Sequence, residues 1–119
     1  MKFILLSFLL LIITPTSISA ELGQAKQLFG TPHFDKMKLK YEQCVLKKGK
    51  QFAKVSTPSE AIKFAPIACK RELLIIKKFF LNSAFKESVI QGLVTSIQEG
   101  VEIDLVNTVY NERLKFLKD

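Results

Sequence analysis

A single histidine, His33, is the only side chain in this 119-residue sequence that ordinarily titrates near neutral pH. Catalysis by His33 requires a nucleophile or a substrate proton within hydrogen-bond reach, and the sequence suggests no such partner. The serines and threonines form no G-x-S-x-G motif, and the five glycines are too scattered to make a phosphate-binding loop. We therefore expect a non-enzymatic protein without a cofactor, and we interpret His33 as an exposed residue in a first helical turn.

Lysines recur at helical spacing between residues 36 and 54. The series consists of Lys36, Lys40, Lys47, Lys50 and Lys54. Successive positions are separated alternately by four and three residues, and Gln43 occupies the position between Lys40 and Lys47. This spacing places all five on one helix face, away from the apolar positions of the same segment. A basic face of this kind attracts anionic partners such as lipid headgroups, acidic glycans or acidic proteins. The lysines are our candidate binding residues, and the alternative is a merely solvated face.

The two cysteines, Cys44 and Cys69, favour a disulfide over a metal or redox site. A structural zinc site needs four suitable ligands, which two cysteines and one histidine do not supply. A redox-active pair would normally be close in sequence, as in a C-x-x-C motif, and these two residues are far apart. We expect a structural disulfide and no metal site.

The apolar periodicity predicts an all-α fold of three or four helices in an antiparallel bundle. The first helix spans residues 32 to about 55, after a Thr31-Pro32 start signal. The second begins at the cap Thr57-Pro58-Ser59-Glu60 and runs to about residue 81, with a kink expected at Pro66. It has a second apolar side at Ile67, Leu74 and Leu81, so we expect it to pack on more than one face.

The segment from Ala84 to residue 118 has two interpretations. Its first half has an apolar stripe that includes Phe85, Ile90 and Ile97, whereas the apolar positions beyond Gly100 move to another side. That second set comprises Ile103, Val106, Val109, Tyr110, Leu114 and Leu117. We favour a break near Gly100 that gives a third and a fourth helix, and one long helix with different partners along its length is the alternative. The nearby acids Glu99, Glu102 and Asp104 are interpreted as a solvated surface.

An antiparallel pairing of the first two helices brings the cysteines together. With a turn between Ser56 and Thr57, Cys44 and Cys69 each lie about twelve residues from the turn, roughly 18 Å along the helix. Both also belong to apolar stripes. The same register places Phe34 opposite Phe79, and it places Glu72 opposite Tyr41, where a carboxylate can accept the phenolic hydrogen. We therefore expect one disulfide to join the first two helices.

The N-terminus has the layout of an export signal. Lys2 precedes an apolar run from Phe3 to Ile13, and small residues end at Ala20. The run of 11 residues is shorter than the roughly 20 that a membrane span requires. We expect residues 1–20 to be a signal peptide, residues 21–31 a loose extension, and residues 32–119 a single helical domain.

Export gives the first testable prediction. The protein recovered from the periplasm or the medium is expected to begin at, or within one residue of, Glu21. Its intact mass checks this, and a mature protein that retains Met1 would contradict it.

The formal charge of +7 is uneven along the chain. Residues 21–86 hold 14 basic and 5 acidic residues, whereas residues 87–119 hold 3 basic and 6 acidic ones. We expect a periplasmic or secreted interaction protein with a basic face and an unidentified partner. The alternatives are a membrane-surface protein that binds anionic lipid or glycan, and a small periplasmic stress chaperone. Export and the lack of a recognised motif argue against nucleic acid as partner.

Overall fold

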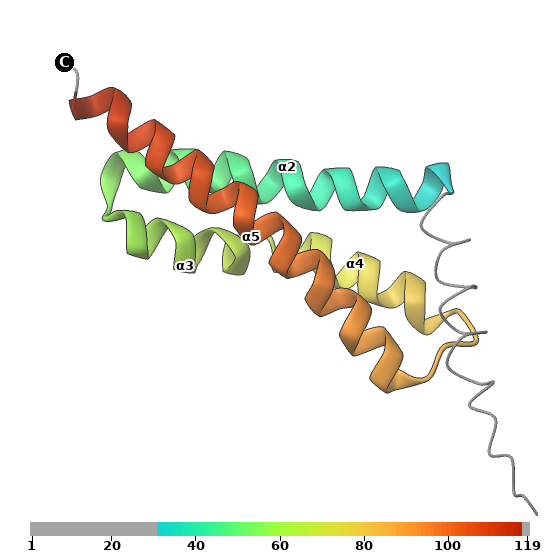
Figure 1. The fold of residues 1–119 in the computed structure, drawn as a ribbon. Helices are drawn as coiled ribbons and strands as arrows, with labels where there is room; N and C mark the ends of the chain where they lie inside the picture. Colours follow the sequence, from blue (N-terminus) through green and yellow to red (C-terminus); the bar gives the residue numbers. More distant parts are fainter. Residues whose placement is uncertain (1–30, 118–119) are drawn as a thin grey trace, which may run out of the picture.

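The computed structural model describes residues 31–117, and four helices account for nearly all of them (Figure 1). They are α2 (Pro32–Val55), α3 (Pro58–Ala68), α4 (Lys70–Leu81) and α5 (Glu87–Leu117). The all-α fold class is thereby confirmed for this part of the chain, whereas a regular antiparallel bundle stays a prediction. The expected signal peptide and residues 21–30 of the expected extension lie outside the described residues.

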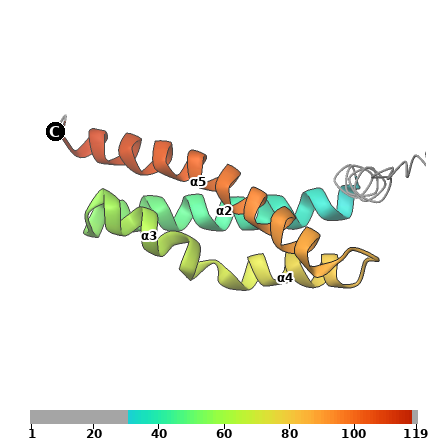
Figure 2. The ribbon, with the colours of Figure 1, turned by 60° about the horizontal axis from the view of Figure 1, so that its bottom comes forward.

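Three of the helices lie along a common direction, and the fourth crosses them. In Figures 1 and 2, α3 and α4 follow one another back alongside α2, whereas α5 crosses α2 obliquely. Contacts near its two ends attach α5 to different helices. Phe85, just before α5, stacks on Phe80 of α4, and Arg113 near its C-terminal end donates a hydrogen bond to the Ala53 carbonyl at 3.3 Å. Along its length α2 lies against all three other helices.

The predicted start signals of α2 and α3 are confirmed. The Thr31 hydroxyl accepts a hydrogen bond from the Phe34 amide, and the Thr57 hydroxyl accepts one from the Glu60 amide at 3.2 Å. In both helices a proline occupies the first position, where its missing N–H has no intrahelical partner to lose. The connection between α2 and α3 lies at Ser56 and Thr57, as the register requires.

The second predicted helix is divided at Cys69, and the expectation of one kinked helix is wrong. Pro66 has no N–H to donate to the Ile62 carbonyl, and α3 ends two residues later at Ala68. Cys69 leaves the helical conformation, with a φ of −106° and a ψ of 19°, and its amide donates to the Pro66 carbonyl at 3.1 Å. The chain then starts again as α4 at Lys70. The proline thus ends the helix instead of bending it.

The third predicted segment is one uninterrupted helix, and the favoured break near Gly100 is wrong. It also begins at Glu87, three residues later than expected. The buried stripe of its first half continues through Val101, Leu105 and Val109 at steps of four. By contrast, Ile103, Tyr110 and Leu114 are exposed. The apolar positions that move to another side of the helix beyond Gly100 therefore do not form a second buried face.

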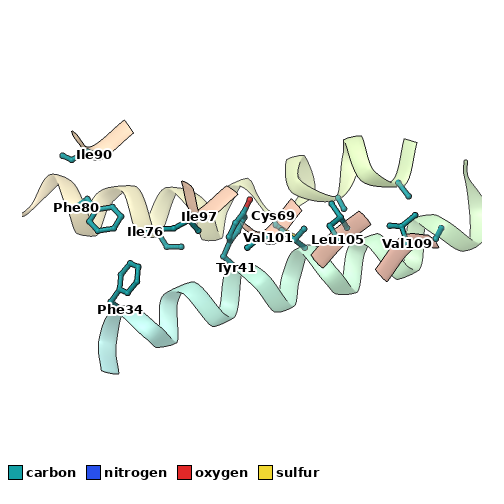
Figure 3. Packing of buried hydrophobic residues seen from close by; sticks show 14 of the residues in the cluster. Phe34, Tyr41, Cys69, Ile76, Phe80, Ile90, Ile97, Val101, Leu105 and Val109 are labelled. Atoms are coloured by element: carbon teal, nitrogen blue, oxygen red, sulfur yellow. The ribbon is translucent and has the colours of Figure 1, made fainter. Parts of the chain in front are cut away.

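The core is one line of apolar side chains enclosed by α2, α3, α4 and α5 (Figure 3). At one end Phe34, Phe79, Phe80 and Phe85 stack in succession, with ring centroids 5.6–6.4 Å apart. The contact between Phe34 and Phe79 confirms the register predicted for this pair. The other end contains small residues of α2 and α3, Ala53 and Ala61, with Leu105 and Val109 of α5.

Several apolar residues expected in the core face solvent instead. Val55, which shares the apolar side of the first predicted helix, is the last residue of α2 and is 83% exposed. Ile67 and Leu74 are 60% and 50% exposed, and Leu81 is also exposed, so the α3–α4 segment buries one side only. The expectation that this segment packs on more than one face is therefore wrong.

Candidate functional site

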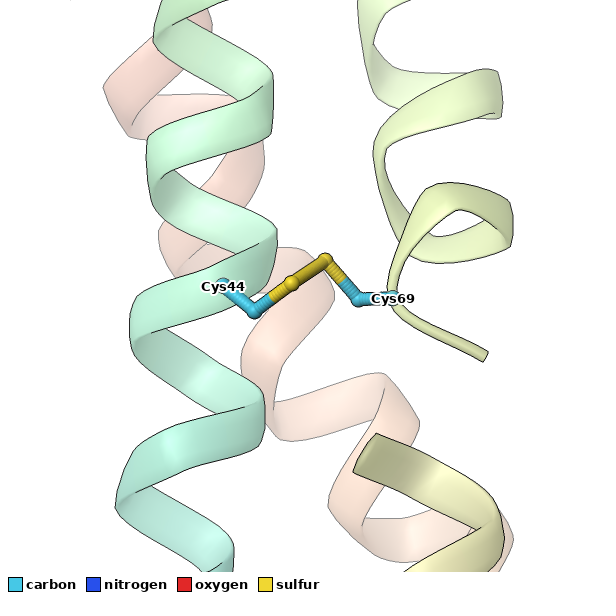
Figure 4. Close-up of a disulfide and its surroundings, with 2 residues drawn as sticks. All are labelled: Cys44 and Cys69. Carbon is cyan, nitrogen blue, oxygen red and sulfur yellow. A yellow bond between two sulfur atoms is a disulfide. The ribbon is translucent and has the colours of Figure 1, made fainter. Parts of the chain in front are cut away.

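The predicted disulfide is present between α2 and the break that separates α3 from α4 (Figure 4). The Cα atoms of Cys44 and Cys69 are 6.0 Å apart, and the residues are separated by 25 positions in the sequence. Cys69 is fully buried, whereas Cys44 is half-buried at the surface of α2. The bond holds the interrupted end of α3 against the middle of α2, and both sulfurs are thereby withdrawn from thiol chemistry.

The five candidate lysines share one exposed face of α2, which we call the lysine row: Lys36, Lys40, Lys47, Lys50 and Lys54. The residues of α2 that contact the core, among them Tyr41, Val45 and Gly49, lie on the opposite face. Between residues 31 and 117 the one ion pair joins Lys115 to Glu112, so none of the five lysines forms an ion pair in this part. The row is a free positive surface over most of the length of α2.

A shallow hollow of about 420 Å³ lies beside the lysine row, next to the disulfide. Lys40, Lys47 and Lys48 contribute to its lining, together with Glu72 of α4. A Glu72 carboxylate oxygen lies within 4.8 Å of both disulfide sulfurs. Glu72 therefore lies beside the disulfide, where it reduces the positive charge at one edge of the row.

The carboxylate that acts electrostatically on Tyr41 is Glu102 of α5, not the Glu72 that the sequence register places opposite it. Burial raises the pKa of the Tyr41 phenol, and the negative charge of Glu102 raises it further, since both disfavour the phenolate. Among the described residues no hydrogen bond joins Tyr41 to Glu72. Tyr41 and Glu102 instead border a second hollow, where α2, α3 and α5 meet.

His33 occupies the exposed position expected in the first turn of α2. Its ring meets the Phe79 ring edge-on, with centroids 5.6 Å apart. The imidazole therefore contacts an apolar ring, and Phe79 offers it no nucleophilic group. The geometry around His33 therefore suggests a packing role at the end of the aromatic stack.

The residues of the hollow at Tyr41 were missed by sequence reasoning. Glu99 and Glu102 were interpreted as a solvated surface, yet they border this hollow together with Ile62 and Pro66 of α3. The i, i+3 spacing of the two carboxylates was visible in the sequence, but nothing in it indicated that Tyr41 and α3 face the same point.

Comparison with known proteins gives no relative from which a function can be carried over. No protein-family model, curated protein or solved structure matches the chain. Over the described residues, no helix is both long enough and apolar enough to span a membrane.

Proposed function

We propose that this is an exported, non-enzymatic helical interaction protein that binds an anionic partner through the lysine row. The observation that carries the proposal is the row itself, five exposed lysines on the face of α2 opposite the core, without an ion pair among the described residues. Export is supported by the sequence of residues 1–20 and by the disulfide, a bond typical of oxidising compartments.

The row has the dimensions of a multivalent contact. From Lys36 to Lys54 it extends about 27 Å along α2, at 1.5 Å per residue. At physiological salt, exposed charges are screened beyond about 8 Å, so single lysines attract little from a distance. Close apposition to an anionic surface contributes about 1 kcal/mol per lysine, which is enough in sum for weak, reversible attachment.

A charge-neutralising triple variant tests this proposal. Replacing Lys40, Lys47 and Lys50 with glutamine is expected to leave the helical circular dichroism unchanged, because all three side chains are exposed. Binding is expected to weaken by about 3 kcal/mol at most, measured at low salt by sedimentation with phosphatidylglycerol vesicles and by retention on heparin.

A second triple variant is the matched control. Lys63→Gln, Lys70→Gln and Lys78→Gln remove the same charge from exposed positions on α3 and α4, outside the row. The proposal requires this control to bind more tightly than the variant in the row. If both triple variants bind alike, or if the parent binds neither probe at low salt and recovers no specific acidic protein, the lysine row is only a solvated face.

The same experiment separates the candidate partners. Binding to vesicles alone favours a membrane-surface protein, and binding to heparin alone favours an acidic glycan. Binding to neither, together with recovery of a specific acidic protein from the periplasm by the parent and not by the variant in the row, favours a protein partner.

A stress chaperone is the second candidate, and the exposed apolar side chains favour it. Phe64, Ile67 and Leu74 on α3 and α4 are each about half exposed or more, and chaperones hold unfolded clients through such surfaces. This function would appear as suppression of client aggregation at low pH that the triple variant in the lysine row retains.

A further inference from the structure

A cavity of about 490 Å³ opens on the side of α2 opposite the lysine row, where α2, α3 and α5 meet. Its size lies within the range of small-molecule sites, which are concave and combine apolar walls with a few polar groups. Val45 of α2, with Ile62 and Pro66 of α3, supplies apolar lining, and Glu99 and Glu102 of α5 add carboxylates. The cavity thus combines an apolar wall with negative charge.

Tyr41 contributes a hydroxyl group that makes no hydrogen bond to the described residues. The residue is only 1% exposed, yet it lines the cavity. Figure 3 shows its hydroxyl oxygen pointing away from α2. No hydrogen bond joins this hydroxyl to any residue between 31 and 117, and its oxygen is not sealed from solvent. Because this oxygen is accessible from the cavity and a hydroxyl can both donate and accept a hydrogen bond, it is available to a ligand that enters the cavity.

Two carboxylates of α5 border the cavity although the protein is strongly basic. Glu99 and Glu102 are exposed, lie three residues apart on α5, and take part in no ion pair within the described residues. Lys63 also borders the cavity, but its ammonium lies over the Phe64 ring, 5.5 Å from the ring centroid. Among the described residues, the charged side chains that border the cavity are therefore two carboxylates and one ammonium.

We propose that this cavity binds a small organic cation that carries an ammonium group on a short apolar chain. Glu99 and Glu102 attract the ammonium, and the Tyr41 oxygen accepts one of its hydrogens. The apolar chain then covers Ile62 and Pro66, removing their surface from water. An anionic ligand is disfavoured because it would meet both carboxylates.

Hexylammonium is a suitable probe, with hexanol and hexanoate as its neutral and anionic counterparts. Titration into the exported, disulfide-bonded protein is followed by calorimetry and by the NMR shifts of backbone amides. Hexylammonium is expected to bind more tightly than either counterpart and to shift amides around Tyr41, Ile62 and Glu102. Equal binding of hexanol, or shifts confined to other parts of the protein, would overturn the proposal.

Two variants test the contributions of the side chains. Glu99→Gln with Glu102→Gln is expected to weaken hexylammonium binding about tenfold or more, since hydrogen bonds to charged groups are the stronger ones. Tyr41→Phe, which keeps the ring in the core and removes only the hydroxyl, is expected to weaken it about fivefold. Thermal unfolding confirms that each variant is folded.

A charge-matched pair serves as the control. Glu87→Gln with Asp104→Asn removes the same net charge from α5 at exposed positions that do not line the cavity. The control is expected to bind hexylammonium as the parent does. If it loses as much affinity as the variant in the cavity, the attraction is a general effect of net charge and the proposed site is wrong.

Discussion

Replacement of Cys44 and Cys69 together by alanine is expected to lower the free energy of unfolding by about 3.5 kcal/mol. The bond closes a loop between residues 25 positions apart, so that its loss enlarges the conformational freedom of the unfolded chain. Domains of this size are stable by about 5–15 kcal/mol, and the bond therefore accounts for a large share of the total. Urea unfolding followed by circular dichroism measures the loss.

The single variants distinguish the bond from the packing of its sulfurs. Either single substitution removes the whole bond, so each is expected to lose nearly as much stability as the double variant. Cys69→Ala is expected to lose slightly more than Cys44→Ala, because Cys69 is fully buried and its sulfur also fills core volume. A loss of stability in the double variant equal to the sum of the two single losses would contradict a shared bond. Two free thiols in the denatured parent protein would also contradict it.

The sequence predicted those features that depend on contacts within one helix or across one turn. Thr31 and Thr57 cap helices because their hydroxyls satisfy amides three residues later, an interaction within one turn. The disulfide followed from a turn at Ser56 and helical spacing, and it needed no knowledge of α5. The lysine row likewise required only the period of a single helix.

Features that depend on tertiary contact were predicted poorly. Ile103, Tyr110 and Leu114 were assigned to a buried face by their apolar character, but α5 diverges from the other helices in a direction that periodicity does not encode. The cavity was missed for the same reason, since Tyr41 and Glu102 are brought together only by the crossing of α5 over α2. Apolar spacing defines a stripe, whereas the partner helix decides how much of it is buried.

The crossing of α2 and α5 depends on Gly49, and Gly49→Val is expected to lower the free energy of unfolding by about 3 kcal/mol. Gly49 is buried, and a Cβ atom added to it would overlap Leu105 Cδ1 and lie 3.3 Å from Val109 Cγ2. Both neighbours are fully buried on α5, so a shift of either side chain disturbs the packing of the core. Valine adds two further methyl groups at this contact and forces the helices apart.

Alanine substitutions at three glycines separate this packing effect from helix propensity. Alanine favours a helix by about 1 kcal/mol over glycine, and at Gly92 and Gly100 an added Cβ meets no atom within 4 Å. Gly92→Ala and Gly100→Ala are therefore expected to stabilise the protein by up to about 1 kcal/mol each. Gly49→Ala is expected to destabilise it, because the overlap with Leu105 outweighs the gain in propensity. Stabilisation by Gly49→Ala in urea unfolding would mean that α2 and α5 do not approach each other this closely.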